Sequence, residues 1–158
     1  AETIDEKPAF RDAFRQRRCL VVADGFYEWA KTPTGRKQPY FITVAGDQPF
    51  AFAGLWESWR GPGGERIQSC TIAVTQANDM LRPIHDRMPA ILDGDHFDSW
   101  LDMKAPLAEG QGAAQAVPRR DDAFPGQFAG QRRSQRRPGL PRANGPAVMS
   151  CHAARSSV

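Results

Sequence analysis

The chain has 158 residues and a formal net charge of +3, and its length is that of one domain. The charge is divided unevenly. Residues 1–104 hold 13 basic and 15 acidic side chains, a net of −2, and residues 105–158 hold 8 basic and 3 acidic ones, a net of +5. The second part is mostly Ala, Gly, Pro, Gln and Arg, and it can bury too little apolar surface to offset chain entropy. We expect one folding unit, residues 1–104, and a disordered tail, residues 105–158.

Several classes of protein are excluded by simple patterns. No apolar run approaches the roughly 18 residues that a membrane helix needs, so we expect no membrane partner. The first six residues, Ala-Glu-Thr-Ile-Asp-Glu, are acidic and lack the apolar segment of a secretory signal. The absence of an initiator Met suggests that the sequence starts partway through a longer one. Three widely spaced cysteines without a C-x-x-C pair argue against a disulfide framework or a zinc knuckle. They fit a reducing cytoplasm, where we expect the protein to reside.

The elements expected in chain order combine helices with short strands. Pro8 and the Phe10–Phe14 spacing predict a short first helix. Asp93 is placed to cap a later helix with Phe97, Trp100 and Leu101 on one side. Between them, apolar runs separated by Gly, Pro and Asp turns predict strands at Cys19–Ala23, Gly25–Trp29, Tyr40–Val44, Phe50–Leu55, Ser69–Thr75 and Met88–Leu92, with one helical turn at Ala77–Leu81. The close spacing of the first four strands predicts an antiparallel meander, and the whole order predicts the α+β class.

The tail after Lys104 allows two interpretations. Every basic residue in it is Arg, and Ala, Gly, Pro and Arg, which dominate it, are encoded by GC-rich codons. One hypothesis is an out-of-frame reading of a GC-rich gene. The other is a genuine disordered basic arm that binds polyanions without specificity.

A first candidate cluster is Asp-Gly-Phe-Tyr-Glu-Trp, which ends at Glu28 and Trp29. In a strand, Phe26 and Glu28 share one face, and Tyr27 and Trp29 share the other. A carboxylate among three aromatic side chains is partly desolvated, which raises the pKa of a carboxyl group toward the range of an acid/base catalyst. The alternative is an exposed glutamate at a strand edge.

A second candidate cluster is Pro-Ile-His-Asp-Arg-Met-Pro, in which two prolines stiffen a loop that carries His85 and Arg87. Imidazole titrates near neutral pH, and a guanidinium can grip a phosphate with two donors. The alternative is an ordinary loop histidine beside a local Asp–Arg pair. Arg11, Arg15 and Arg18 recur at helical spacing, either as a solvated face or as phosphate contacts, and Arg18 is kept as a DNA-binding candidate. Asp93, Asp95 and His96 lie close in sequence without a converging ligand set, so no metal site and no cofactor is expected.

Taken together, these clusters resemble the SOS response-associated peptidase (SRAP) family of abasic-site processing proteins. The matching stretches occur in the family's order across residues 1–103: Ala1–Thr3, Lys7–Phe10, Arg18–Val21, Ala23–Trp29, Lys37–Ile42, Phe52–Glu57, Thr75–Asp79 and Ile84–Pro89. The pairing of Asp-Gly-Phe-Tyr-Glu-Trp with Ile-His-Asp-Arg-Met-Pro is specific. The resemblance implies a mainly antiparallel, barrel-like core with short flanking helices.

What the resemblance implies for function is binding of single-stranded DNA at abasic sites by a monomer associated with the nucleoid. Family members use a Cys at the mature N-terminus: its amine condenses with the sugar aldehyde and its thiol closes a thiazolidine ring, which crosslinks protein to DNA. By similarity, Glu28 is the catalytic glutamate that moves protons, and His85 assists beside the sugar. Trp29 corresponds to the aromatic that stacks on bases, and Thr75 and Arg87 approach the phosphates or sugar. The family's peptidase activity is removal of its own initiator Met.

Three departures from the family pattern lead to alternatives. The N-terminal Cys and an Asn of the family site are expected upstream of Ala1, and the family's C-terminal segment does not follow residue 103. None of Cys19, Cys70 and Cys151 can replace the nucleophile because none carries a free α-amine. The sequence therefore predicts part of an SRAP domain that forms no crosslink itself. The alternatives are a noncovalent single-stranded DNA-binding module and an inactive truncated copy.

Overall fold

The computed structural model describes residues 1–44, 49–115 and 151–152 of the chain. Its first element is the helix α1 (Pro8–Gln16), which begins at the proline that the sequence places in the first turn. Proline suits that position because the N–H that it lacks would have no partner within the helix there. Phe14 is fully buried, whereas Phe10 is 41% exposed. The predicted helix is confirmed, and one of its two aromatic side chains enters the core.

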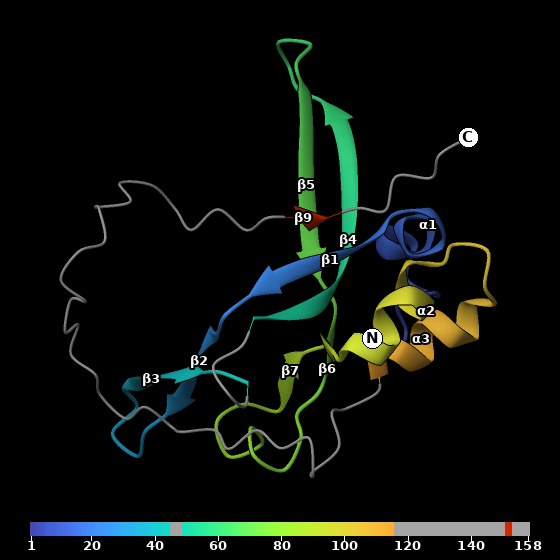
Figure 1. The fold of residues 1–158 in the computed structure, drawn as a ribbon. Coiled ribbons are helices and arrows are strands. Elements are labelled where there is room, and N and C mark those ends of the chain that lie inside the picture. The colour runs from blue at the N-terminus through green and yellow to red at the C-terminus, as the bar shows by residue number, and fades with distance from the viewer. Residues whose placement is uncertain (45–48, 116–150, 153–158) are drawn as a thin grey trace, which may run out of the picture.

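The largest sheet is antiparallel and centres on one long strand. That strand, β4 (Phe50–Arg60), pairs on one side with β1 (Arg18–Ala23) and on the other with β5 (Arg66–Ile72). Two short strands complete the sheet: β8 (Ile91–Leu92) pairs with β4, and β9 (Cys151–His152) pairs with β1. The far halves of β4 and β5 leave the body as a two-stranded hairpin that turns at residues 61–64 (Figure 1).

Strand β1 packs tightly on β4 where the two strands bring Cys19 and Gly54 opposite each other. A Cβ at Gly54 would come within 2.7 Å of Cγ2 of Val21 and 2.9 Å of Sγ of Cys19. Glycine is therefore required here by close approach, since any side chain would push the neighbouring strand away.

Strands β2 (Phe26–Lys31) and β3 (Lys37–Ile42) form a separate antiparallel hairpin. The expected meander of the first four strands is wrong: β1 pairs with β4, and β2 and β3 pair only with each other among the described strands. The reason is that β4 satisfies the backbone groups of β1, so the intervening chain leaves the sheet and returns as its own hairpin. The burial of β2 alternates strictly between half-buried and exposed residues, as expected for a hairpin with one inner and one outer face.

Two strands predicted as continuous are each divided by an alanine. Ala73 interrupts the first strand and separates β5 from β6 (Val74–Gln76). Ala90 interrupts the second and separates β7 (Arg87–Pro89) from β8. Buried backbone hydrogen bonds join these two alanines and Ala53, with N···O distances of 2.8 to 2.9 Å. The chain therefore crosses at this junction from the large sheet to the small antiparallel pair β6–β7. The predicted helical turn at residues 77–81 forms hydrogen-bonded turns and no assigned helix.

Helices cover one flank of the large sheet. Asp93 accepts a hydrogen bond from the His96 N–H at the start of the 3-10 helix η2 (Gly94–His96), which continues as α2 (Phe97–Leu101). Trp100 is fully buried and donates from Nε1 to the Cys19 carbonyl at 2.9 Å. The predicted cap and the predicted inward side of this helix are confirmed.

A further helix, α3 (Leu107–Gln115), follows the predicted end of the folding unit at Lys104. Its Ala113 and Ala114 are buried and belong to the same core cluster as Trp100. The folded part therefore extends past the expected boundary, because small residues in α3 can pack closely on α2. The rest of the predicted tail, residues 116–150 and 153–158, lies outside the described residues.

Two buried clusters form the core. One joins α1, α2 and α3 to the large sheet around Phe14, Leu55 and Trp100. The other lies under β1, β4 and the turns after β6, around Val21, Phe52, Leu81 and Met88. The class is α+β as predicted, and the described strands do not close into a barrel. Within the described ranges, no helix is both long and apolar enough to cross a membrane.

Candidate nucleic-acid site

Three aromatic side chains lie together on the outer face of the β2–β3 hairpin. Tyr27 and Trp29 alternate along β2 and are 60% and 47% exposed. Phe41 lies opposite Tyr27 in the hairpin register, with ring centroids 4.9 Å apart, and the Tyr27 and Trp29 rings are 6.3 Å apart. Large exposed rings on a strand form a surface on which bases of a single strand can stack. Trp29 was predicted from sequence, and Tyr27 is a neighbour that the candidate residues did not include.

Glu28 lies on the opposite, inner face of the same hairpin and is half-buried. Its Oε1 accepts a hydrogen bond from the backbone N–H of Trp29 at 3.0 Å. Phe26, on the same face, packs edge-on against Phe52 with ring centroids 5.7 Å apart. Glu28 thus shares the inner face with a ring that packs on the core, and the predicted alternation of Phe26 and Glu28 against Tyr27 and Trp29 is confirmed.

His85 lies in the connection between β6 and β7, with its side chain 46% exposed. Nδ1 lies 3.1 Å from the Arg87 backbone N–H, 3.2 Å from the Arg87 carbonyl and 3.1 Å from Oδ1 of Asp86. In the neutral ring Nδ1 can accept from Arg87, and in the charged ring it can donate to Asp86. The loop thus holds one edge of the imidazole in either protonation state. Nε2 has no hydrogen-bond partner among the described residues and can face a ligand.

Arg87 and Thr75 are held together by Glu2, a residue that the sequence did not single out. The Glu2 carboxylate accepts two hydrogen bonds from the Arg87 guanidinium, at 3.1 and 2.8 Å, and one from the Thr75 hydroxyl at 3.1 Å. The Arg87 side chain thereby holds the pKa of Glu2 well below its usual range. No local pattern could identify Glu2, since its partners come from β6 and β7, far along the chain.

The Glu2–Arg87 pair borders a cavity of about 210 Å³ whose other walls are mainly apolar, including Ile4, Phe10 and Leu55. Thr75 is buried, and Arg87 also donates to the Val74 carbonyl at 2.9 Å. Because the Arg87 guanidinium already has a carboxylate partner, its positive charge is largely compensated within the protein.

Arg18, proposed from sequence as a DNA contact, lies in the core. It is 1% exposed, and its guanidinium lies between the rings of Phe14 and Trp100, at 5.2 and 5.6 Å from their centroids. It donates to the Asp102 carbonyl, and Nε and Nη1 are buried without a hydrogen-bond partner among the described residues. Burial lowers the pKa of Arg18. The placement corrects the interpretation of the Arg11–Arg15–Arg18 spacing as one surface, because the helix ends before Arg18 and β1 turns that side chain inward.

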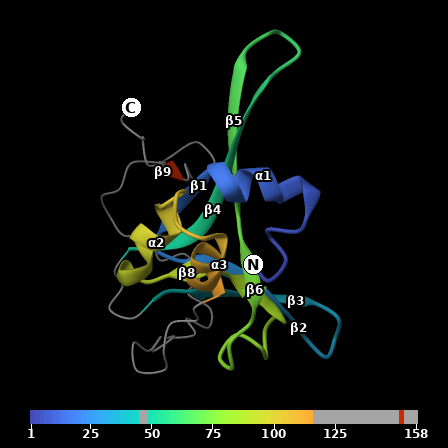
Figure 2. The same ribbon diagram turned by 90° about the vertical axis from the view of Figure 1, so that its right-hand side faces the viewer.

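The two predicted clusters lie at the same end of the molecule. Two residues near the candidates pack against the same buried cluster. They are Phe26, which shares a strand face with Glu28, and Ile84, which directly precedes His85. Both ribbon views place the β2–β3 hairpin and the turns after β6 at the end opposite the tip of the β4–β5 hairpin (Figures 1 and 2). No hydrogen bond or ion pair links Glu28 to His85 in the part of the chain that is described. The described ranges also contain no group of three or more potential metal ligands.

The protein therefore belongs to the α+β class and has antiparallel sheets. One end of it carries a carboxylate, an imidazole and exposed aromatic rings. The sequence model described as SOS response associated peptidase (SRAP) matches residues 1–123, and the chain belongs to this family. The resemblance predicted from sequence is confirmed.

Relatives of known name agree with this assignment. The chain is 46% identical over 104 residues to the abasic site processing protein YoaM of Bacillus subtilis. The alignment covers 66% of this chain and 46% of YoaM. It is 37% identical over 122 residues to the abasic site processing protein HMCES of Xenopus tropicalis, covering 65% of this chain and 36% of HMCES. The chain thus spans less than half the length of these relatives.

Solved structures also share the fold. A crystal structure of a Bacteroides thetaiotaomicron protein aligns with a TM-score of 0.67 at 32% identity, covering 72% of this chain and 50% of that one. A Bordetella bronchiseptica protein aligns with a TM-score of 0.64 at 29% identity, covering 75% and 58% respectively.

Proposed function

We propose that this protein processes abasic sites in single-stranded DNA within the nucleoid, acting as a monomer. Membership of the SRAP family and the names of the relatives support a role at abasic sites. The observation that carries the single-stranded preference is the exposed Tyr27–Trp29 face, since paired and stacked bases of a duplex cannot lie flat on protein rings.

In this proposal Glu28 and His85 transfer protons at the abasic sugar. A half-buried carboxylate on the inner face of the hairpin can take and return a proton at a bound sugar. The imidazole has its Nδ1 edge fixed by the loop and its Nε2 free, which suits a group that must present one nitrogen to a ligand. Glu2 holds Thr75 and Arg87 together on β6 and β7, and in this proposal these two residues contact the phosphates or the sugar.

The covalent step of the family needs a Cys that carries a free α-amine. The amine condenses with the sugar aldehyde, which releases water and forms an imine. The thiol then adds to the imine carbon and closes the ring. Cys19, Cys70 and Cys151 all lie within the chain, with peptide-bonded nitrogens. We propose that the 158-residue chain supplies the recognition surface and that its own cysteines form no such ring.

Exposed tryptophans at opposite ends of the molecule allow a direct test of recognition. We expect the chain to bind a labelled abasic single strand more tightly than the same lesion in a duplex. Trp29→Ala should weaken binding about tenfold, the effect of losing one stacked base. Trp59→Ala is the matched control, because Trp59 is 50% exposed on the distant β4–β5 hairpin. Equal binding of duplex, or equal losses in the two variants, would overturn the proposal.

The covalent step is tested separately on a denaturing gel. The 158-residue chain mixed with abasic single-stranded DNA should give no band at the mass of protein plus DNA. Such a band would show that another amine or thiol of the chain can serve as the nucleophile, and it would refute this part of the proposal. A noncovalent module remains the alternative function, and it is favoured if Glu28→Gln leaves every property of the complex unchanged.

A further inference from the structure

The outer face of the β2–β3 hairpin ends in a pair of lysines. In the hairpin register Lys31 lies opposite Lys37, two positions beyond the pair of Trp29 and Pro39. Side chains two positions apart on a strand share a face, so the lysines continue the face that carries Tyr27 and Trp29. Both lysines are exposed, and Arg36 lies next to them in the exposed turn. One face of the hairpin therefore runs from aromatic rings to a cationic tip.

This lysine pair has no counter-charge within the described protein. Like charges directly opposite each other on antiparallel strands are destabilising. No carboxylate of the described residues lies within 4.0 Å of Lys31, Arg36 or Lys37. A comparable arginine pair on the β4–β5 hairpin makes hydrogen bonds to its neighbours at the surface: Arg66 donates to the Ser58 hydroxyl at 2.8 Å, and Arg60 donates to the Gly64 carbonyl. Nothing comparable holds the lysines, which leaves their ammonium groups available to an anion.

We propose that this tip binds the phosphates of a single-stranded DNA whose bases stack on Tyr27 and Trp29. Strand geometry places Trp29 and Lys31 about 7 Å apart along β2, so one strand of DNA can reach both. Exposed rings interleaved with cations are the combination that single-strand binding surfaces use. The inference rests on the proposed function and extends it outward: the hairpin would hold the nucleotides that flank the abasic site while Glu28 and His85 face the lesion.

The salt dependence of binding separates phosphate contacts from stacking. The full chain is titrated with a labelled abasic single strand at a series of salt concentrations, as wild type and as the double variant Lys31→Gln, Lys37→Gln. Each neutralised phosphate on a single strand contributes about 0.7 to the slope of log K against log salt. We expect the double variant to reduce the slope by about 1.4 if both lysines contact phosphates. An unchanged slope would overturn the inference.

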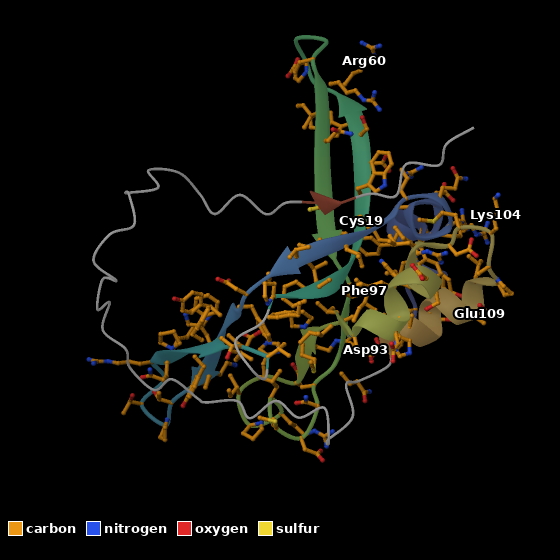
Figure 3. All side chains as sticks on the ribbon, in the orientation of Figure 1. Cys19, Arg60, Asp93, Phe97, Lys104 and Glu109 are labelled. Atoms are coloured by element: carbon orange, nitrogen blue, oxygen red, sulfur yellow. The ribbon has the colours of Figure 1, made fainter. Side chains whose placement is uncertain are left out.

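A matched control removes the same charge at the other end of the molecule. Arg60→Gln with Arg66→Gln alters a cross-strand pair beside the tip of the β4–β5 hairpin, where Figure 3 labels Arg60 far from Asp93, Lys104 and Glu109. We expect this variant to keep the wild-type slope. A reduction equal to that of the lysine variant would show a nonspecific effect of net charge and would also overturn the inference.

The aromatic part of the face is tested with Tyr27. Tyr27→Ala should weaken binding about tenfold, and Tyr27→Phe should keep the wild-type affinity, because stacking needs the ring and not the hydroxyl. Equal losses in both variants would contradict stacking. If Trp29→Ala weakens binding but the lysine variant keeps the wild-type slope of log K against log salt, only this inference is overturned. Absence of binding by the wild type would overturn the proposed function as well.

Discussion

Glu2 is the residue that fastens the N-terminal segment to the β6–β7 sheet. Its carboxylate accepts hydrogen bonds from Arg87, from the Thr75 hydroxyl and from the Gln76 backbone N–H at 3.0 Å. An acceptor with this many donors is strongly stabilised in its charged form. The same bonds fix the side chains of Thr75 and Arg87, so Glu2 acts on the candidate site by positioning its neighbours.

Replacing Glu2 should make the free energy of unfolding depend less on pH in the acidic range. Its pKa is depressed in the folded protein, so its stabilisation is present above the ordinary value of 4.5 and is lost as the pH falls below it. Glu2→Gln should lower the free energy of unfolding by about 1 kcal/mol near neutral pH, since both partners are more than a third exposed. Urea unfolding at several pH values should show this difference shrinking in acid. Glu6→Gln, at an exposed residue, is the control, and parallel curves for wild type and Glu2→Gln would contradict the assignment.

Arg18 shows how a charged side chain can belong to the interior. Its stem and guanidinium fill the space between Phe14 and Trp100, and only one of its donors has a described partner. Sequence reasoning treats arginine as a surface residue because an unpaired buried charge is costly. The two rings that enclose it come from α1 and α2, so no local pattern could reveal the burial.

An uncharged side chain of similar length should replace Arg18 without loss. Arg18→Met should leave the free energy of unfolding unchanged or raise it by about 1 kcal/mol, because it removes unsatisfied buried donors. Arg18→Ala should lower it by about 2 to 4 kcal/mol by leaving a cavity. The affinity of Arg18→Met for single-stranded DNA should stay within about twofold of wild type. A large loss of affinity with unchanged stability would restore Arg18 as a DNA contact.

At the scale of elements, the β2–β3 hairpin is the unit that carries the candidate site. It has its own backbone pairing, one half-buried face with Glu28 and one exposed face with Trp29. Its turn contains Gly35, whose φ of +79° lies in the left-handed region that favours glycine. The orientation of both faces therefore depends on a turn that tolerates few other residues.

Substitutions at two glycines with open space around them measure the effect of backbone strain apart from that of packing. A Cβ would meet nothing within 4 Å at either Gly35 or Gly112, but only Gly35 has a positive φ. Gly35→Ala should lower the free energy of unfolding by about 1 kcal/mol. Gly112→Ala, within α3, should raise it by about 1 kcal/mol. Thermal or urea unfolding measures both, and a stabilising Gly35→Ala would contradict the assigned turn.

Local elements were predictable and their pairing was not. The first helix, the Asp93 cap and the alternation along β2 follow from spacings within a few residues. The pairing of β1 with β4, and the division of two strands at Ala73 and Ala90, depend on contacts between distant segments. The candidate residues Glu28, Trp29 and His85 came from motifs, whereas Glu2 and the lysine pair emerge only when the strands are in register.

At the scale of the whole molecule, the chain separates two ends with different chemistry. One end gathers the β2–β3 hairpin and the His85 loop, and the other is the tip of the β4–β5 hairpin (Figure 1). Residues 1–104, which contain both ends, carry a net charge of −2, so net charge does not favour DNA binding by this part of the chain. In the proposed function, the contribution of residues 1–104 to single-strand affinity comes from the aromatic and cationic face of one hairpin.

The most direct measurement compares one single strand with and without an abasic site. The full chain should bind the abasic strand more tightly than the intact strand in a competition assay. Glu28→Gln and His85→Gln should reduce this preference while leaving affinity for the intact strand unchanged, because the proposed function assigns both side chains to the lesion and not to the flanking bases. Equal affinity of the wild-type chain for the two strands would contradict a role of this end of the molecule at abasic sites.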